Sequence, residues 1–475
     1  MTECNQDSFY FASPFRREVV ARFDGGTMTS DAGALLLHKL EQQTGILRQF
    51  AACFTDYRQP DRIEHRLSEL IRQRVYGLVL GYEDLNDHDQ LRRDPLFAVL
   101  NGKEDVKGEQ RRRELDRGKP GAGKSTLNRL ELTPADANAA SRYKKIVLDE
   151  QAVDRLWVDL YVQAQRRQPE LIVLDLDATD DPVHGEQEGR FFHGYYREYC
   201  YLPLYIFAGE HLLCARLRGA DRDAAAGSLQ EVQRIVQQLR QVWPTAAIVL
   251  RADSGFCREA LMAWCEQAGV DYVFGLAQNS RLRRIIGRQL QEARQEFART
   301  GKAARVFTEF SYRTRKSWTR ERRVIAKAEH LAKGENPRFM VTSWGSEQRP
   351  ARALYEQFYC ARGEMENRIK EQQLALFADR TSTAYLRSNQ IRLYFSSLAY
   401  GLLMALRRLG LKGTAMAQAQ CNTIRLRLLK IGAQIRVTVR RIWISMASGH
   451  PGVALFQQAY ENLAALGPPL TTEAS

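Results

Sequence analysis

Short runs of apolar residues mark two buried strands in the middle of the chain. Residues 171–174 and 246–250 are apolar throughout, and each run leads directly into charged residues. Continuous apolar runs of this length are typical of strands that are buried on both faces of a sheet. Two further strand-like runs, 201–208 and 211–217, are separated only by Gly209 and Glu210, which predicts a hairpin.

Helical patterns alternate with these strands. Residues 224–243 place apolar side chains three and four positions apart, a second helix is expected through Leu261 and Trp264, and a short strand follows at 272–274. The order strand, hairpin, helix, strand, helix, strand is that of the ribonuclease-H-like α/β fold. In that topology the first strand is central and the strand after the first helix lies parallel beside it. The carboxyl ends of both strands then open on one crevice.

The same patterns divide the chain into five parts. Charge-rich strand patterns at 305–312, 322–326 and 339–343 predict a β-rich insertion, and a strong helix is expected from about 351 to 378. The predicted parts are a helical N-terminal region (1–145), the first part of a ribonuclease-H-like core (146–280), the β-rich insertion (281–350), the second part of the core (351–384) and a basic helical C-terminal region (385–475).

The charge of the chain indicates what kind of partner the protein binds. Seventy Lys and Arg residues against 56 Asp and Glu residues give a net charge of +14, which favours a polyanionic partner. Residues 381–460 contain eleven basic residues and no acidic residue, and a second basic cluster lies at 313–323. A solvated surface is the alternative interpretation of either cluster taken alone.

Cysteine usage and hydropathy exclude several classes of protein. The eight cysteines form no Cys-x-x-Cys pair, and no apolar stretch reaches 18 residues. The N-terminus lacks the apolar core of a secretory signal. We therefore expect no disulfide framework, no structural zinc site, no membrane partner and a reducing cytoplasmic location.

Candidate chemistry begins with carboxylates at the ends of the two buried strands. Asp175 and Asp177 end the first strand, and Asp253 follows the second. A carboxylate at the end of a buried strand is costly unless it is paired or binds a metal. Capping of the following turn or helix is the alternative for Asp177 and for Asp253.

A third carboxylate lies on the helix expected after residue 350. Tyr359, Arg362, Glu366 and Lys370 fall within a stripe roughly 80° wide on one face of an α-helix. An aromatic hydroxyl, a guanidinium, a carboxylate and an ammonium suit a metal ligand flanked by phosphate-binding cations. The alternative is a salt-bridged surface helix, since Glu366 and Lys370 are also spaced for an i,i+4 pair.

The runs LDLDATDD, LRADSGF and YCARGEMENRIK resemble the three catalytic segments of DDE transposases from bacterial insertion sequences. They resemble most closely the branch whose third segment carries a Tyr-x2-Arg-x3-Glu-x6-Lys signature. Tyr359, Arg362 and Glu366 match that spacing, whereas the Lys position holds Gln373, and Lys370 on the same helix face is the candidate for its role. The resemblance spans about residues 170–375.

The resemblance implies a metal-dependent enzyme. Asp177, Asp253 and Glu366 would be the catalytic metal ligands, with Asp177 favoured over Asp175 because the family shows Asp-x-Thr. Carboxylates without nearby Cys or His select Mg²⁺ or Mn²⁺, and we expect two ions per site. Water would first free a 3′-hydroxyl at the element end, and that hydroxyl would then attack target DNA. Tyr359 and Arg362 would contact the DNA phosphates.

The resemblance also implies the partners. The N-terminal region would bind double-stranded DNA at terminal inverted repeats, and the basic C-terminal region would contact DNA or a second protomer. The expected assembly is a homodimer on DNA in the bacterial cytoplasm, associated with the nucleoid. In the basic cluster at 313–323, Arg315, Lys316 and Trp318 are candidate DNA contacts, with Trp318 stacking on an unpaired base. A half-buried strand tryptophan is the alternative.

One motif argues for a different activity. Residues 118–125 satisfy the phosphate-loop pattern Gly-x4-Gly-Lys-Ser, in which Lys124 would contact nucleotide phosphates. A phosphate loop follows a buried strand, and residues 111–117 are too charged to form one. We therefore expect a basic loop that leads into a DNA-contacting helix. A P-loop ATPase, a ribonuclease-H-like nuclease or resolvase without strand transfer, and a non-catalytic DNA-binding regulator are the alternatives. His184 and His193 are expected to be loop or hairpin residues.

Overall fold

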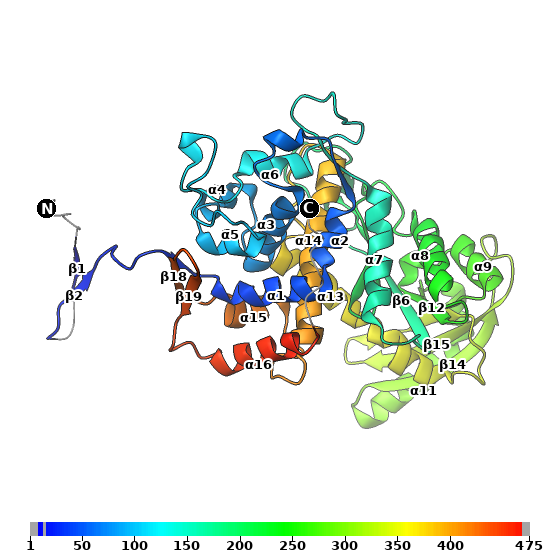
Figure 1. Cartoon of the computed structure of the whole chain (residues 1–475). Coiled ribbons are helices and arrows are strands. Elements are labelled where there is room, and N and C mark those ends of the chain that lie inside the picture. Colours follow the sequence, from blue (N-terminus) through cyan, green and yellow to red (C-terminus); the bar gives the residue numbers. More distant parts are fainter. Residues whose placement is uncertain (1–7, 13–15, 468–475) are drawn as a thin grey trace, which may run out of the picture. The chain divides into compact units, whose positions relative to one another are not determined.

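The computed structural model describes residues 8–12 and 16–467 and forms two compact units (Figure 1). Unit 1 contains the described residues of 1–149, together with 375–377 and those of 398–475. Unit 2 contains residues 150–374 and 378–397. Within the described ranges, no helix has the length and apolarity that crossing a membrane requires.

Unit 1 is mainly helical, as the sequence predicts for its N-terminal part. Its central helix, α3 (Leu67–Leu80), is buried at every position from Gln73 to Leu80 and stops at Gly81, which takes the left-handed conformation (φ 93°) that favours glycine. The other helices are α1 (Leu35–Thr44), α2 (Ile46–Ala51), α4 (His88–Leu91), α5 (Pro95–Asn101), α6 (Lys124–Glu131), α15 (Cys421–Ile424) and α16 (Val453–Ala464).

Short strands complete unit 1. They are β1 (Phe9–Phe11), β2 (Val19–Ala21), β3 (Met28–Thr29), β4 (Phe54–Asp56), β5 (Ile146–Leu148), β18 (Ala433–Val437) and β19 (Ile442–Met446). The C-terminal part is therefore not wholly helical as expected, because β18 and β19 form an antiparallel hairpin that also pairs with β3. The residues of β18 alternate between apolar and polar, which is a strand signal that the expectation of helices throughout this part did not use.

Unit 2 is built on one large mixed sheet. The strand order is β11-β10-β6-β12-β13-β17-β15-β14, with β16 paired to β15. The predicted parallel pairing of β6 with β12 is confirmed, and β6 also pairs with β10 in the antiparallel direction. The bounds are β6 (Leu171–Ala178), β10 (Leu204–Ala208), β11 (His211–Arg216), β12 (Ala247–Ala252), β13 (Asp271–Leu276), β14 (Ala304–Tyr312), β15 (Arg322–Leu331), β16 (Gly334–Glu335) and β17 (Arg338–Thr342). A small separate sheet contains β7 (Asp181–Pro182), β8 (Phe191–His193) and β9 (Glu198–Tyr201).

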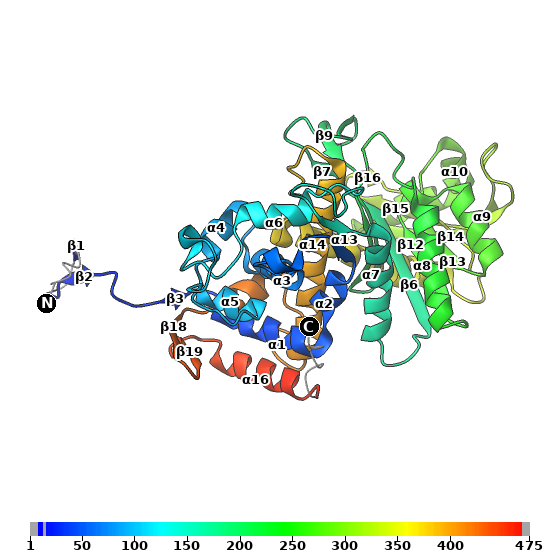
Figure 2. The ribbon, with the colours of Figure 1, turned by 45° about the horizontal axis from the view of Figure 1, so that its top comes forward.

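Both faces of the main sheet are covered, which explains the continuous apolar runs of β6 and β12 (Figure 2). On one face, Leu174 of β6 packs in the same core cluster as Ile235 of α8 (Ser228–Val242). On the other face, Val249 packs in a cluster with Leu354 and Tyr355. The remaining helices are α7 (Glu150–Ala164), α9 (Glu259–Ala268), α10 (Ser280–Ile285), α11 (Gly287–Thr300), α12 (Ala351–Ala353), α13 (Gly363–Leu376) and α14 (Leu386–Ala405), the last running into unit 1.

The strands of the segment expected as a β-rich insertion continue the main sheet. Residues 281–350 begin with most of α10 and all of α11, and their strands then pair onto the edge of the core through β17, which lies antiparallel to β13. The local sequence of each segment predicts a strand, but it does not indicate which other strand that segment pairs with.

An ion pair links the two central strands of the sheet. Asp175 of β6 and Arg251 of β12 are register partners, and both are buried. Arg251 donates two hydrogen bonds to the carboxylate, from Nε to Oδ1 at 2.5 Å and from Nη2 to Oδ2 at 2.8 Å. This pair satisfies two charges that the sheet would otherwise bury alone.

Arg251→Met is expected to lower the free energy of unfolding by about 3 kcal/mol, because it leaves the Asp175 carboxylate buried without its partner. The double variant Asp175→Leu/Arg251→Met is expected to recover part of that loss, since no charge is then left alone. Urea unfolding followed by circular dichroism measures both. A loss of under about 1 kcal/mol in Arg251→Met would contradict a stabilising role for the pair.

Candidate active site

The ends of β6 and β12 bring two of the predicted carboxylates together. Leu176 and Ala252 are the last register pair of the two parallel strands, and Asp177 and Asp253 come next on the chain. Partners in a parallel pair point to the same face, so both aspartates leave the sheet on one side. The proximity is also electrostatic, because the Asp253 carboxylate is one of the charges that raise the pKa of Asp177.

Asp253 also has the capping role considered from the sequence. Its Oδ1 accepts a hydrogen bond from the Gly255 amide at 2.8 Å and so closes the 3₁₀ turn Ser254–Phe256. In the part of the chain that the structure describes, its Oδ2 accepts no hydrogen bond. Capping therefore fixes the orientation of this carboxylate and leaves one oxygen available.

The third carboxylate is carried by an irregular helical passage rather than by one regular α-helix. It runs from α12 through a π-helical stretch, Leu354–Tyr359, and a 3₁₀ turn, Cys360–Arg362, into α13. Side chains three apart eclipse each other in a 3₁₀ turn, so Tyr359 and Arg362 are brought onto one line. Stretches of π-helix are rare and occur frequently at functional sites.

Arg362 joins the first and third carboxylates. Its Nη1 lies 3.4 Å from Oδ2 of Asp177, and its Nη2 donates to Oε1 of Glu366 at 2.6 Å. The guanidinium is largely buried, with 18% of its side chain exposed, and the Asp177 side chain is 14% exposed. The structure thus brings Asp177, Asp253, Arg362 and Glu366 into one cluster in which a single cation faces three carboxylates.

Tyr359 lies against the backbone beside Asp253. A Cβ built on Gly275 of β13 would stand 2.6 Å from the Tyr359 hydroxyl and 2.9 Å from the Ser254 amide nitrogen. Only glycine leaves this space free, so Gly275 allows the phenol to approach the Asp253 turn. Burial, with the Asp253 charge nearby, raises the pKa of Tyr359, so the phenol keeps its proton at neutral pH.

Asp177 and Asp175, two residues apart, have different environments. Burial, reinforced by the Asp253 and Glu366 charges, raises the pKa of Asp177 to about 6 against the opposing effect of Arg362. Both oxygens of Asp175 are bonded to Arg251 in the interior of the sheet. This contrast favours Asp177 over Asp175 as the carboxylate that meets a ligand.

The donor set of the cluster fits a hard divalent cation. Among the described residues, no group of three Asp, Glu, His or Cys side chains is arranged so that it could hold a metal ion as it stands. Asp177 and Glu366 nevertheless already share one cation, the guanidinium of Arg362. All three carboxylates offer only oxygen ligands, the kind that Mg²⁺ and Mn²⁺ prefer.

Lys370 does not reach this cluster through any contact in the described structure. It is exposed on α13, and its expected i,i+4 partner Glu366 bonds to Arg362 instead. Gln373, at the signature lysine position, donates from Nε2 to the Asp180 carbonyl at 2.9 Å. The glutamine therefore anchors the loop that follows β6.

The candidate DNA contacts of the basic cluster separate into two kinds. Arg315 and Lys316 are exposed in the turn between β14 and β15. Trp318 is only 7% exposed, stacks edge-on against Tyr312 and belongs to the main core of unit 2. The indole is therefore not accessible to an unpaired base, and we do not retain the stacking role.

The structure also shows where the two histidines and the phosphate-loop sequence lie. His184 is an exposed loop residue, and His193 ends β8 against Tyr196. Residues 118–123 follow a 3₁₀ turn, Glu114–Asp116, instead of a strand. Lys124 begins α6, and its Nζ bonds to Asn86 at 2.9 Å and lies 3.5 Å from Asp89. The Lys124 amide at the helix start donates to Asp89 Oδ1 at 3.2 Å, so the amide that would face a phosphate already bonds to a carboxylate.

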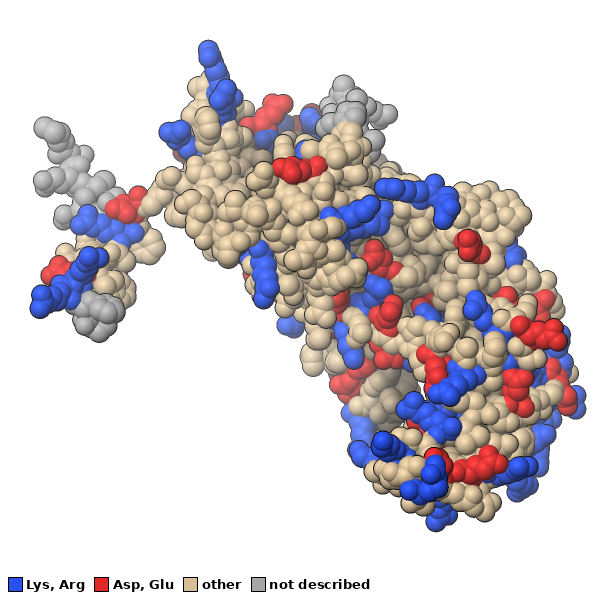
Figure 3. Space-filling view, turned by 90° about the horizontal axis from the view of Figure 1, so that it is seen from below, with Lys and Arg blue, Asp and Glu red and all other residues tan. Residues whose placement is uncertain are grey.

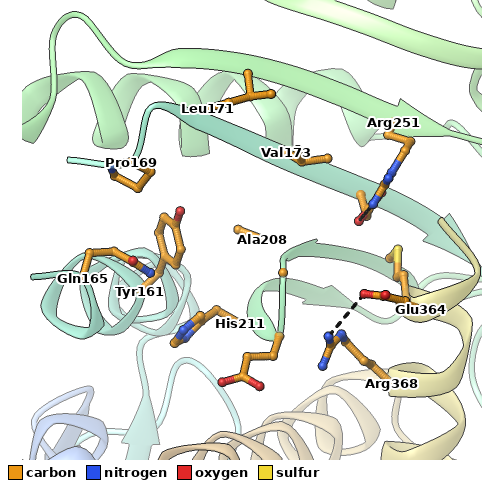
Figure 4. A pocket seen from close by; sticks show the side chains of 14 residues that line it. Tyr161, Gln165, Pro169, Leu171, Val173, Ala208, His211, Arg251, Glu364 and Arg368 are labelled. Atoms are coloured by element: carbon orange, nitrogen blue, oxygen red, sulfur yellow. Dashed lines mark hydrogen bonds and ion pairs between the residues drawn. The ribbon is translucent and has the colours of Figure 1, made fainter. Parts of the chain in front are cut away.

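A cavity of about 440 Å³ adjoins the cluster in unit 2 (Figure 4). Leu171 and Val173 of β6 line it on the sheet side, and Glu364 and Arg368 of α13 line it opposite. None of the three clustered carboxylates is in its lining. The space thus lies beside the cluster and not around it.

Sequence reasoning did not identify two residues of the site. Arg251 has no signal of its own, because a basic residue in a buried strand is identified only by its partner. Gly275 does have a sequence signal, since an isolated glycine in a strand suggests that other groups approach the backbone closely.

Comparisons with known proteins identify the family of the chain. A sequence model described as Transposase DDE domain group 1 matches residues 11–468. No curated protein matches the chain. Among solved structures, a cryo-EM structure of a piggyBac transposase synaptic complex with hairpin DNA shows a distant likeness, with a TM-score of 0.40 and 11% identity over 94% of this chain and 87% of that chain. Because the family match spans nearly all of the sequence, the chain belongs to the transposases of DDE domain group 1.

Proposed function

We propose that this transposase serves a bacterial insertion sequence, cuts DNA at the element ends by metal-dependent hydrolysis and joins the freed 3′-hydroxyl to target DNA. The observation that carries the proposal is the convergence of Asp177, Asp253 and Glu366 on Arg362. The match of Tyr359, Arg362 and Glu366 to the Tyr-x2-Arg-x3-Glu-x6-Lys branch supports the same assignment, with Gln373 as its one departure.

We assign the core of unit 2 to the ribonuclease-H-like fold. The order β11-β10-β6-β12-β13, in which the first three strands are antiparallel and the last three parallel, supports this assignment. The strands β17, β15 and β14 would be an insertion that continues the core sheet. The glutamate then returns to the core on α13 after that insertion, as in the resemblance.

The chain's own residues would work as follows. Asp177, Asp253 and Glu366 would hold two Mg²⁺ or Mn²⁺ ions, which when bound activate the attacking oxygen and stabilise the leaving one. Arg362 bridges two of these carboxylates in the free protein, and a DNA phosphate would draw it away by bidentate hydrogen bonding. Tyr359 keeps its proton and so can donate to a phosphate oxygen. Neither step needs ATP, because phosphodiester exchange is nearly balanced in energy.

The proposed partner is double-stranded DNA. We assign the terminal inverted repeats to unit 1 and the target or flanking DNA to exposed basic residues that include Arg315, Lys316 and Lys370. A homodimer on paired ends remains part of the proposal, since two ends must be joined together. Cutting without joining would identify the nuclease alternative.

Asp253→Asn and Glu366→Gln are each expected to lower Mg²⁺-dependent cleavage and strand transfer by more than about 100-fold, because even an outer-shell change at a metal site costs 10–100-fold. Labelled element-end duplex with and without target DNA measures both steps. Glu364→Gln is the matched control, since Glu364 lies on the same helix and is exposed. Unchanged cleavage in Glu366→Gln would exclude the cluster as the active site.

Cleavage is expected to fall as the pH drops below about 6, because Asp177 takes up a proton there and loses its affinity for a cation. The inflection should move to lower pH as the Mg²⁺ concentration rises, since the ion competes with the proton. The raised pKa means that the folded state holds this proton more tightly than the unfolded chain. Protonation of Asp177 therefore favours the fold, and circular dichroism at each pH separates inactivation from unfolding. An inflection whose pH does not change with the Mg²⁺ concentration would contradict the assignment of Asp177 as a metal ligand.

Lys124→Ala is expected to leave cleavage unchanged and independent of ATP, because Lys124 is bonded to Asn86 and Asp89 in the described structure. Its half-exposed ion pair contributes at most about 1 kcal/mol to stability. The element-end assay with and without ATP measures the first point. Loss of cleavage together with an ATP requirement would support the phosphate-loop alternative.

A further inference from the structure

The β18–β19 hairpin has two unlike faces. Ala433 and Ile435 of β18 are buried, and Ala433 packs in a small core with Ile444 and Met446 of β19. The residues that alternate with them on β18, Gln434 and Arg436, are exposed. Successive residues of a strand point to opposite faces, so one face of the hairpin belongs to the core and the other faces outward.

The base of the hairpin is fixed to unit 1. Lys430, just before β18, bonds to the buried carboxylate of Asp31 at 2.7 Å and stacks on Tyr82. The amide of Ala32 donates to the carbonyl of Ile431 at 3.0 Å. The hairpin is therefore held firmly at one end, beside β3 (Figure 2).

The free end presents cations beside apolar side chains. Arg436 stands opposite Trp443 in the strand register, and the Arg441 guanidinium lies 5.6 Å from the centre of the Trp443 ring. Val439, at the tip next to Arg440, is fully exposed. Hydrogen bonds between Thr438 and the backbone of Arg441 close the turn, so these side chains extend from a defined frame.

In the described structure, Arg436, Arg440 and Arg441 are exposed and form no ion pair. Figure 3 shows acidic and basic side chains mixed over the lower right part of the face in view, so net charge alone does not select a DNA-binding surface. The hairpin lies instead within residues 381–460, where the sequence has no acidic residue.

We propose that the β18–β19 hairpin is an arm that docks on duplex DNA, with Arg436, Arg440 and Arg441 on the phosphates. A two-stranded ribbon is narrow enough to follow a groove of the duplex. Trp443 and Val439 would lose their exposure against the sugars of the groove wall. The inference takes from the proposed function only that the partner is DNA. Phosphate contacts carry no sequence information, so the arm holds DNA of any sequence and leaves the choice of element ends to other residues.

The test uses the full chain without divalent metal, so that binding is measured apart from cleavage. Fluorescence anisotropy compares wild type with Arg440→Gln/Arg441→Gln on an element-end duplex and on a random duplex, over a range of salt. Arg288→Gln/Arg299→Gln is the matched control, because it removes two charges from exposed positions of α11. The hairpin variant is expected to bind both duplexes about tenfold or more weakly at 0.1 M salt and to lower the salt slope by about 2.

Three outcomes decide the inference. Equal affinity and equal slope in the hairpin variant and wild type would overturn it. A changed monomer–dimer balance without changed DNA affinity, measured by mass photometry, would also overturn it and assign the hairpin to a second copy of the chain. Hairpin-dependent binding by a wild-type protein that fails to cleave in Mg²⁺ would support the arm and refute the proposed function.

Discussion

The buried ion pair between Asp175 and Arg251 is the constraint on which the site of unit 2 depends. It fixes two adjacent parallel strands in register, and Asp177 and Asp253 follow two residues further along the chain. Arg251 also donates from Nη1 to the Phe358 carbonyl at 2.5 Å, so the same guanidinium ties the helical passage to the sheet. Since Tyr359 follows Phe358 directly, one buried arginine sets the positions of groups from three elements.

Arg362 reduces the electrostatic repulsion between the carboxylates that this arrangement brings together. Three carboxylates at one crevice repel each other, and burial raises the cost, which the raised pKa of Asp177 records. A guanidinium between Asp177 and Glu366 lowers that cost without a bound ligand. Because a guanidinium bonds to phosphate in the same bidentate way as to carboxylate, the group that stabilises the free site can exchange one anion for another.

The sequence predicts those parts of unit 2 whose signals are local. The apolar runs predict β6 and β12, their carboxyl ends predict where Asp177 and Asp253 lie, and the motif spacing places Tyr359, Arg362 and Glu366 on one helical passage. Other features depend on partners far along the chain. The pairing of β17 with β13, the π-helical stretch before Arg362 and the Asp175–Arg251 pair are each decided by tertiary packing, which no local pattern reports. The different environments of Asp175 and Asp177 are likewise invisible to a local pattern, because the partner of Asp175 lies 76 residues away on the chain.

The same distinction between paired and unpaired charge applies to the whole chain. A surplus of fourteen positive charges indicates a polyanionic partner but not where it binds. Arg216 and Arg322 are each surrounded by carboxylates and contribute to the fold, so they add little to the field outside the protein. Among the described residues, Arg440 and Arg441 have no such partner, and an isolated exposed cation costs the fold nothing while it attracts phosphate at a distance. The location of unpaired arginines, rather than their number, is thus the basis of the DNA contact proposed for the hairpin.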